Sequence, residues 1–158
     1  MSSFDESKFL DSTTTDALTR RPPIPAGTVL PGLITDVKIE PWTSNKPDAK
    51  VKSGYKAVVK IEIDLTSQPD IRSQVGIDKV ILTPGIMLET TPDGNGLDWG
   101  QGKNGALRRY REALGMNNPG ETFSLRSMTG RMLLVKIKHR TFEGEFFDEV
   151  DSVAKIGG

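Results

Sequence analysis

Apolar and polar residues alternate over positions 55–65 with one exception. Every second residue from Tyr55 to Leu65 is apolar, and the residues between them are charged except for Val58. Residues 131–140 form a second alternating run. On one face of this run, the last three residues are basic: Lys136, Lys138 and Arg140. A period of two residues predicts β-strands with one buried and one solvent-exposed face, which is typical of an antiparallel sheet.

Three further segments have strand patterns. Residues 28–39 end in an alternating stretch, residues 78–88 are mostly apolar, and residues 146–156 carry spaced aromatic and branched side chains. Pro84 and Gly85 interrupt the second of these, and we expect a bulge or bend there because proline has no backbone N–H for a strand ladder. A short hairpin is predicted between the last two strands.

Residues 105–114 carry apolar side chains at helical spacing and predict a helix. Asn104 is the expected N-cap residue, and Gly115 is the expected residue just past the C-terminus. Residues 66–77 are predicted as a polar loop, and residues 90–105 as a long glycine-rich connection.

The predicted order is three strands, a helix and two strands. This is the order of the OB-fold, a five-stranded Greek-key barrel with one helix between its third and fourth strands. We therefore expect a mostly β protein with an OB-fold domain over residues 25–158. Residues 1–24 are rich in Ser, Thr and acidic side chains, and we expect a flexible, disordered acidic N-terminal tail there.

The 158 residues include 21 basic and 21 acidic side chains, so the formal net charge is zero, yet the charges are unevenly distributed. Residues 102–140 carry 9 basic and 2 acidic side chains, a net charge of +7, whereas residues 141–158 carry 1 and 5, a net charge of −4. This asymmetry indicates either a polyanionic partner or two oppositely charged strands that face each other. The sequence leaves both interpretations open.

The composition excludes several kinds of site. The chain has no cysteine, which rules out disulfides, thiolate metal ligands and Cys nucleophiles, and His139 is its single histidine. No nucleophile or orienting group is recognisable for His139, and we expect it to pack at the end of the barrel. Neither a membrane-spanning apolar run nor the apolar core of a secretory signal occurs, so we expect a cytoplasmic protein.

Two motifs permit an enzymatic interpretation. Gly100 to Gly105 matches G-x-G-x-x-G, but a dinucleotide site needs a buried strand just before it, and the preceding residues are loop-like. We expect these glycines to make the connection mobile, so that it closes over an extended ligand. A metal-dependent nuclease built on Asp70 or Glu62 is a second alternative, although its residues occur in the reverse of the usual order. We expect no enzyme activity, no cofactor and no metal.

Basic and aromatic side chains gather around the predicted ligand face of the barrel. Single-stranded nucleic acids bind to cations that follow the phosphates and to flat side chains on which bases stack. Both tryptophans fall in predicted loops, where no core requires them, whereas Tyr55 and Tyr110 are expected in the core. The predicted DNA-binding residues are Trp42, Lys46, Lys50, Lys52, Lys56, Lys60, Trp99, Lys103, Arg108, Arg111, Lys136, Lys138, Arg140 and Phe142.

Residues 25–156 resemble the OB-fold single-stranded DNA-binding proteins encoded by tailed bacteriophages. The stretches that carry the resemblance are Ile24–Gly27 with Gly32–Val37, Tyr55–Ile61, Ala106–Gly115 with Pro119–Phe123, and Leu125–Gly130 with Val135–His139 and Gly144–Val150. The resemblance implies sequence-tolerant binding of single-stranded DNA in phage replication or recombination, within the host cytoplasm and alongside phage proteins of those pathways. A homo-oligomer is left open. The alternative is a structural or adaptor β-barrel of a phage that binds no nucleic acid.

Overall fold

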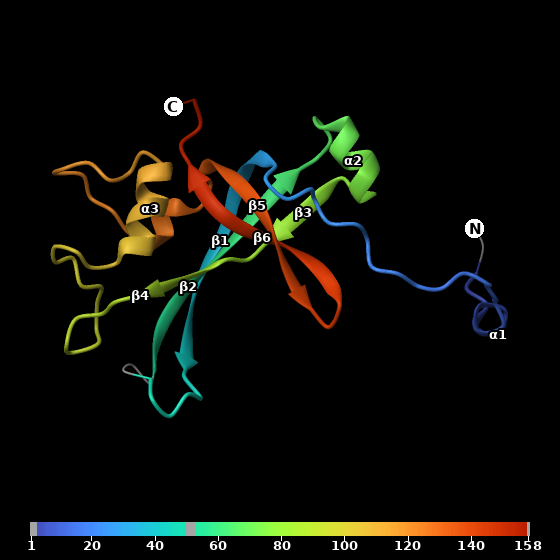
Figure 1. Ribbon diagram of the computed structural model, residues 1–158, viewed down its shortest axis with the longest axis horizontal. Coiled ribbons are helices and arrows are strands. Elements are labelled where there is room, and N and C mark those ends of the chain that lie inside the picture. Colours follow the sequence, from blue (N-terminus) through green and yellow to red (C-terminus); the bar gives the residue numbers. More distant parts are fainter. Residues whose placement is uncertain (1–2, 50–52, 158) are drawn as a thin grey trace.

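The computed structural model of the chain describes residues 3–49 and 53–157, and a six-stranded antiparallel sheet forms its centre (Figure 1). The strands are β1 (Val29–Thr43), β2 (Ser53–Asp64), β3 (Lys79–Leu82), β4 (Gly85–Leu88), β5 (Met132–Phe142) and β6 (Glu145–Ala154). They follow the order β3-β2-β1-β5-β6, and β4 also pairs with β2. The prediction of a mostly β protein is confirmed.

The helices are short: α1 (Glu6–Leu10), α2 (Pro69–Val75), α3 (Gly105–Ala113) and the 3₁₀-helix η1 (Leu125–Met128). Helix α3 confirms the predicted helix, and Gly115 follows it with a φ of +70°. The prediction of a loop over residues 66–77 is wrong, because α2 occupies most of this segment. The helix begins at Pro69, and Gly76 follows its last residue in the left-handed conformation. In the described part of the chain, no helix has the length and apolar composition needed to cross a membrane.

The third predicted strand is divided in two at Thr83 and Pro84. Strands β3 and β4 keep one register on β2, with Leu82 opposite Ile61 and Gly85 opposite Val58. The carbonyl of Pro84 still accepts a hydrogen bond of 2.9 Å from the N–H of Val59, but proline has no N–H to return. The expected interruption is therefore confirmed.

The sheet does not close into a barrel. Strands β3 and β6 end the sheet on its two sides, and β4 and β6 both pack against α3. A cavity of about 660 Å³ lies between Pro84-Gly85, α3 and residues 149–155. Strand β3 contacts β6 without forming backbone pairs with it, and residues of α3 line the space between Pro84 and β6, where proline has no N–H to donate. The structure thus shows an open sheet of six strands where we expected a closed barrel of five.

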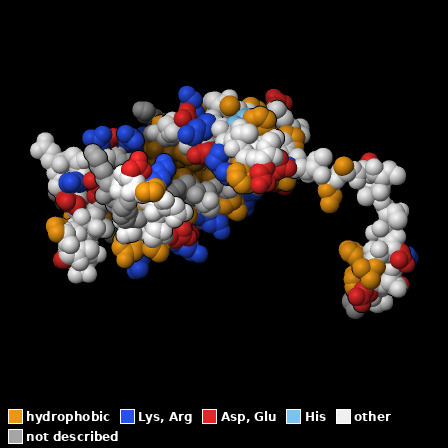
Figure 2. Space-filling view, turned by 60° about the horizontal axis from the view of Figure 1, so that its bottom comes forward, with side chains coloured by type: hydrophobic (Ala, Val, Ile, Leu, Met, Phe, Trp, Pro, Cys, Tyr) orange, Lys and Arg blue, Asp and Glu red, His pale blue; other side chains and the backbone are white. Residues whose placement is uncertain are grey.

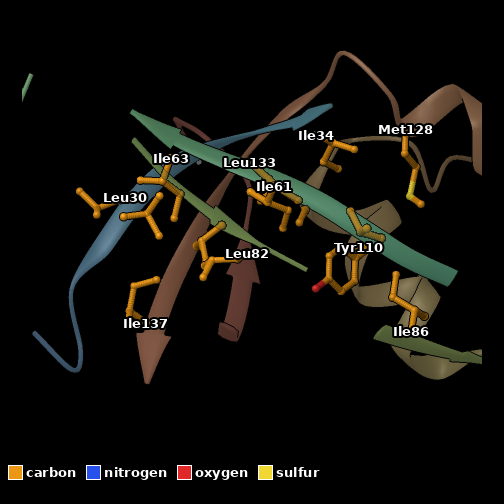
Figure 3. Packing of buried hydrophobic residues seen from close by; sticks show 14 of the residues in the cluster. Leu30, Ile34, Ile61, Ile63, Leu82, Ile86, Tyr110, Met128, Leu133 and Ile137 are labelled. Carbon is orange, nitrogen blue, oxygen red and sulfur yellow. The ribbon is translucent and has the colours of Figure 1, made fainter. Parts of the chain in front are cut away.

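The core lies inside the curl of the sheet and is completed by α3 (Figure 3). Alternate residues of β2 and β5, such as Ile61 and Leu133, are fully buried, as their period of two residues predicts. The chain packs so closely at Gly32 that a Cβ there would lie 2.5 Å from Cγ2 of Ile61. Tyr110 is buried as expected, whereas Tyr55 is 45% exposed because the β1–β2 hairpin extends beyond the core.

The first residues of the chain contact little of the body. Residues 3–19, which we call the arm, are exposed, and α1 lies far from the sheet (Figure 1). Within this arm, the rings of Phe4 and Phe9 contact each other with a centroid distance of 5.5 Å. Its apolar side chains are visible at the projecting end of the molecule (Figure 2).

Residues 20–24, which we call the N-terminal strap, pack against β5 and β6 although the sequence places them in the tail. Nη2 of Arg21 lies 2.6 Å from Oδ2 of Asp148, and the N–H of Ile24 donates to Oδ1 of Asp148 at 2.7 Å. Ile24 is fully buried. Nε2 of His139 lies 2.6 Å from the carbonyl oxygen of Ile24, so the half-buried histidine packs at the end of the sheet as expected.

Candidate functional site

The glycine-rich connection between β4 and α3 folds back against the first turn of the helix. Thr90 and Leu97 form an antiparallel bridge within it. Asn104 begins α3 with a φ of +53°, and its side-chain NH₂ donates to the carbonyls of Glu89 and Asp98, both at 2.9 Å. The predicted N-cap position is confirmed, but the side chain bonds to the connection instead of to the helix N–H groups.

A cavity of about 180 Å³ lies where this connection meets α3, and we call it the cavity at α3. It is separate from the cavity of about 660 Å³ between α3 and β6. Four of the predicted DNA-binding residues line the cavity at α3 together: Trp99, Lys103, Arg108 and Arg111. The connection supplies the first two and α3 supplies the arginines, which are three residues apart and so share a helix face. The structure thus gathers an aromatic ring and three cations that are separated by up to 12 positions in the sequence.

Arg111 organises the aromatic side of this cavity. Its Cζ lies 4.2 Å from the ring centroid of Phe123 and 5.8 Å from that of Trp99, and its Nε donates to the carbonyl of Met116 at 3.1 Å. The Trp99 and Phe123 rings meet edge to face at 6.3 Å, which leaves Trp99 58% exposed. Sequence analysis missed Phe123, because it lies in an irregular segment with no periodic signal.

The other cations of the cavity have acidic neighbours. Nζ of Lys103 lies 3.8 Å from Oε1 of Glu89, and Nε of Arg108 lies 3.7 Å from Oε1 of Glu112. All four side chains are about half exposed. Exposed pairs of this kind contribute about 0–1 kcal/mol, so a phosphate can replace the carboxylate at little cost.

A second group of predicted residues lies along the outer face of β5. Lys136, Lys138 and Arg140 are exposed on alternate positions, and Phe142 ends the strand with 54% exposure. Lys138 is paired with Glu149 of β6, and Nε of Arg140 lies 3.9 Å from Oε2 of the same glutamate. At these positions, β5 and β6 face each other with opposite charges. This is one of the two interpretations of the charge asymmetry that the sequence left open.

The ring of Phe147 brings together two arginines that are distant in sequence. Cζ of Arg20 lies 4.0 Å from its centroid and Cζ of Arg140 lies 5.0 Å from it. Arg20 also donates from Nε to the carbonyl of Phe146 at 3.1 Å. No sequence signal places Arg20 beside Phe147, because the two residues lie more than a hundred positions apart.

The third group is on the outer face of β2. Lys60 pairs with Asp36 across to β1, and Lys56 pairs with Glu40. Both lysines lie on the face away from the core, as expected. Each of these two lysines stands opposite a carboxylate, as Lys138 does on β5, so this face carries alternating charges and no continuous basic track.

Trp42 lies on a strand and not in the predicted loop. Strand β1 extends to Thr43, and Trp42 pairs with Gly54, where a Cβ would lie 3.0 Å from the indole ring. The glycine therefore lets the half-buried indole pack across β2. Among the described residues, its Nε1 is buried without a hydrogen-bond partner. Lys46 is exposed in the following loop. The remaining two predicted residues of this hairpin, Lys50 and Lys52, lie outside the described residues.

The three groups do not share one cavity. No residue of β2 or β5 lines the cavity at α3. Figure 2 shows lysines and arginines in separate places across this face, with acidic side chains between them. The cavity at α3 is therefore the place where the predicted residues are most concentrated.

Of the two carboxylates named for the nuclease alternative, Asp70 is exposed in the first turn of α2, and Glu62 has a basic partner. Glu62 accepts Nζ of Lys79 at 2.6 Å, and this pairing raises the pKa of Lys79. Hydrogen bonds from the hydroxyl and backbone of Thr66 lower the pKa of Asp64. Over residues 3–49 and 53–157, no group of three or more potential ligands lies close enough to hold a metal ion.

A comparison with protein-family models finds no match for the chain, and a search of curated proteins finds none with significant similarity.

Proposed function

We propose that the protein binds single-stranded DNA with little sequence preference, as a non-enzymatic component of phage replication or recombination in the host cytoplasm. The cavity at α3 carries this proposal, because it combines the exposed indole of Trp99 with Lys103, Arg108 and Arg111. A base stacked on the indole would place its phosphates within reach of these cations.

The chemistry of the cavity favours sequence tolerance. Every base has a π-face, so stacking on Trp99 does not discriminate strongly between bases. The guanidinium of Arg111 is already oriented by Phe123 and by the carbonyl of Met116, which leaves further donors for a phosphate. Phosphate contacts position a strand without reading its sequence.

An OB-fold is the proposed classification of the domain. In its favour are the position of α3 between the divided third strand and β5, and the pairing of β1 with both β2 and β5. In this proposal, β3 and β6 contact each other without the backbone pairing that closes an OB-fold barrel, and α3 packs against β4 and β6.

The proposal is tested by titrating the intrinsic tryptophan fluorescence with poly(dT) at increasing salt. We expect quenching at low salt, and a log–log salt slope of about −0.7 for each phosphate contact. A Trp99→Phe variant assigns the quenching to the cavity, and poly(U) measures the preference for DNA over RNA. Wild-type protein without affinity at the lowest salt would reject the proposal.

Two arginines on the same helix provide a matched pair for this titration. Arg111 lines the cavity, whereas Arg109 lines the separate cavity between α3 and β6. We expect Arg111→Gln to weaken binding by about fivefold at 0.1 M salt and to reduce the salt slope by about 0.7, as the loss of one phosphate contact predicts. Arg109→Gln removes the same charge and is expected to leave binding nearly unchanged. An equal loss in both variants would show that only net charge matters.

A structural or adaptor role is the second candidate, and the open sheet favours it. In the described residues, β3 and β6 each have one edge without backbone pairing, although these two strands contact each other, and Ile81 and Met87 are half exposed on the outer face of β3 and β4. Such edges are sites at which further strands can pair. A defined assembly in size-exclusion chromatography with light scattering, combined with no affinity for poly(dT), would support this role.

A further inference from the structure

One buried side chain holds both ends of the connection that carries Trp99 and Lys103. Asn104 is 5% exposed, and it is the one buried polar residue in the described part of the chain. Its side chain donates to the carbonyls of Glu89 and Asp98 and accepts from the N–H of Glu89 at 2.8 Å. Its own N–H donates to Oε2 of Glu89 at 2.7 Å. Four hydrogen bonds thus join the end of β4, the middle of the connection and the start of α3.

The rest of the connection is also bonded internally. The N–H of Asp98 donates to the carbonyl of Glu89 at 2.9 Å, and the N–H of Thr91 donates to the carbonyl of Gly96 at 2.9 Å. Nearer the helix, the N–H of Gly100 donates to Oδ1 of Asp98 at 2.9 Å. Bonds therefore fix the backbone immediately before and after Trp99. This pattern differs from the mobile glycine-rich lid that the sequence indicates.

We infer that residues 89–104 are a preformed platform for the DNA strand and that Asn104 is its positioning residue. The inference rests on the proposed function, since the platform matters for binding only if Trp99 and Lys103 contact DNA. Asn104 touches no ligand in this scheme and acts through the two side chains that it places over the cavity.

Asparagine suits this position for two physical reasons. The backbone has a φ of +53°, a left-handed conformation that asparagine adopts more readily than most residues. The amide also offers donors and an acceptor at once, and the three bonds to Glu89 and Asp98 use both. Aspartate lacks the donors, and glycine keeps the conformation while it lacks the side chain.

A preformed platform predicts a particular kind of binding. A strand that meets an ordered site does not bear the entropic cost of ordering a loop, so affinity is higher than for a mobile one. Association should also occur in one step, with an observed rate that rises linearly with DNA concentration. A lid that closes after binding would instead give a rate that levels off at high DNA concentration.

The test compares Asn104→Gly with Asn95→Gly in the full-length protein, using poly(dT) as the probe. Asn95 lies in the same connection, but it is exposed and its recorded bond uses the backbone N–H. We expect Asn104→Gly to bind about tenfold more weakly with an unchanged salt slope, because every cation remains. Asn95→Gly should bind as the wild type does, and Asn104→Asp provides a second variant if Asn104→Gly does not fold.

Amide hydrogen exchange of residues 89–104 without DNA separates the two ways in which the inference can fail. We expect faster exchange in Asn104→Gly than in the wild type or in Asn95→Gly, whether or not the protein binds DNA. Wild-type protein that does not bind poly(dT) rejects the proposed function, and the exchange data still test the platform. Equal affinity of Asn104→Gly and wild type, or a wild-type association rate that levels off, overturns the positioning role.

Discussion

Tyr110 shows how a single residue of α3 connects the site to the stability of the domain. It is on the same helix as Arg111, but it points into the core and is 9% exposed. Burial raises the pKa of Tyr110 to about 12, whereas a tyrosine in the unfolded chain ionises near pH 10. The phenol therefore stays neutral in the folded state over a range in which the unfolded state loses its proton.

This difference predicts the alkaline stability of the protein. Because the folded pKa is the higher one, the contribution of Tyr110 is complete below about pH 10 and is lost as the pH rises towards 12. We expect the free energy of unfolding to fall by about 2 to 3 kcal/mol over this range through Tyr110 alone. Urea denaturation of wild type and Tyr110→Phe at several pH values measures it, since other groups titrate alike in both. Parallel stability curves would contradict the assignment.

Single residues also show what the sequence reveals about the site. Trp99, Lys103, Arg108 and Arg111 could be chosen because an exposed tryptophan in a glycine-rich segment and basic residues on a helix are visible without a structure. Phe123 could not, since its contact with Arg111 depends on the chain path after α3.

At the scale of elements, periodicity predicted the strands and α3 well, because alternation and helical spacing are local consequences of burial. Helix α2 was missed although Pro69 and Gly76 mark its ends, since only Val75 is fully buried and no apolar period is present. The open sheet was also missed, because closure depends on whether β3 and β6, which contact each other, also form backbone pairs. The N-terminal strap depends on Asp148, more than a hundred residues away.

The strap is predicted to stabilise the domain through one buried carboxylate. The side chain of Asp148 is 2% exposed, and Arg21 and the N–H of Ile24 are its partners. Removing Arg21 leaves this charge without its countercharge, so we expect Arg21→Ala to lower the free energy of unfolding by about 2 kcal/mol. Arg20→Ala loses only exposed contacts at Phe146 and Phe147 and should cost less than about 1 kcal/mol. Urea denaturation compares the two, and equal losses would show that Asp148 does not depend on Arg21.

At the scale of the whole molecule, zero net charge results from opposing regions that the fold keeps partly apart. The basic residues of α3 lie on the body, the acidic residues of β6 face β5, and the acidic arm projects from the opposite side (Figures 1 and 2). Glu149 of β6 lies opposite Lys138 and beside Arg140 of β5, whereas the described residues of the arm are exposed and lie on the other side of the molecule from the cavity at α3 (Figure 1). We therefore expect the arm to affect DNA binding through the electrostatic field of its carboxylates.

This arrangement predicts how removal of the arm affects DNA binding. Residues 1–18 carry one lysine and four carboxylates, a net charge of −3, so their deletion raises the net charge of the chain from zero to +3 and keeps the strap intact. We expect the truncated protein to bind poly(dT) about three- to tenfold more tightly at about 0.01 M salt, where the Debye length is about 30 Å. The gain should vanish near 1 M salt, where that length is about 3 Å.

A full-length variant with Asp5→Asn, Glu6→Gln, Asp11→Asn and Asp16→Asn separates charge from bulk. It removes the four carboxylates and keeps the arm with Lys8, which gives a net charge of +4 against +3 in the truncated protein, so an electrostatic effect predicts a gain at least as large. A gain in the truncated protein alone would mean that the arm blocks the site sterically. A gain that persists at 1 M salt would contradict a long-range field, because charges separated by more than a Debye length no longer interact appreciably.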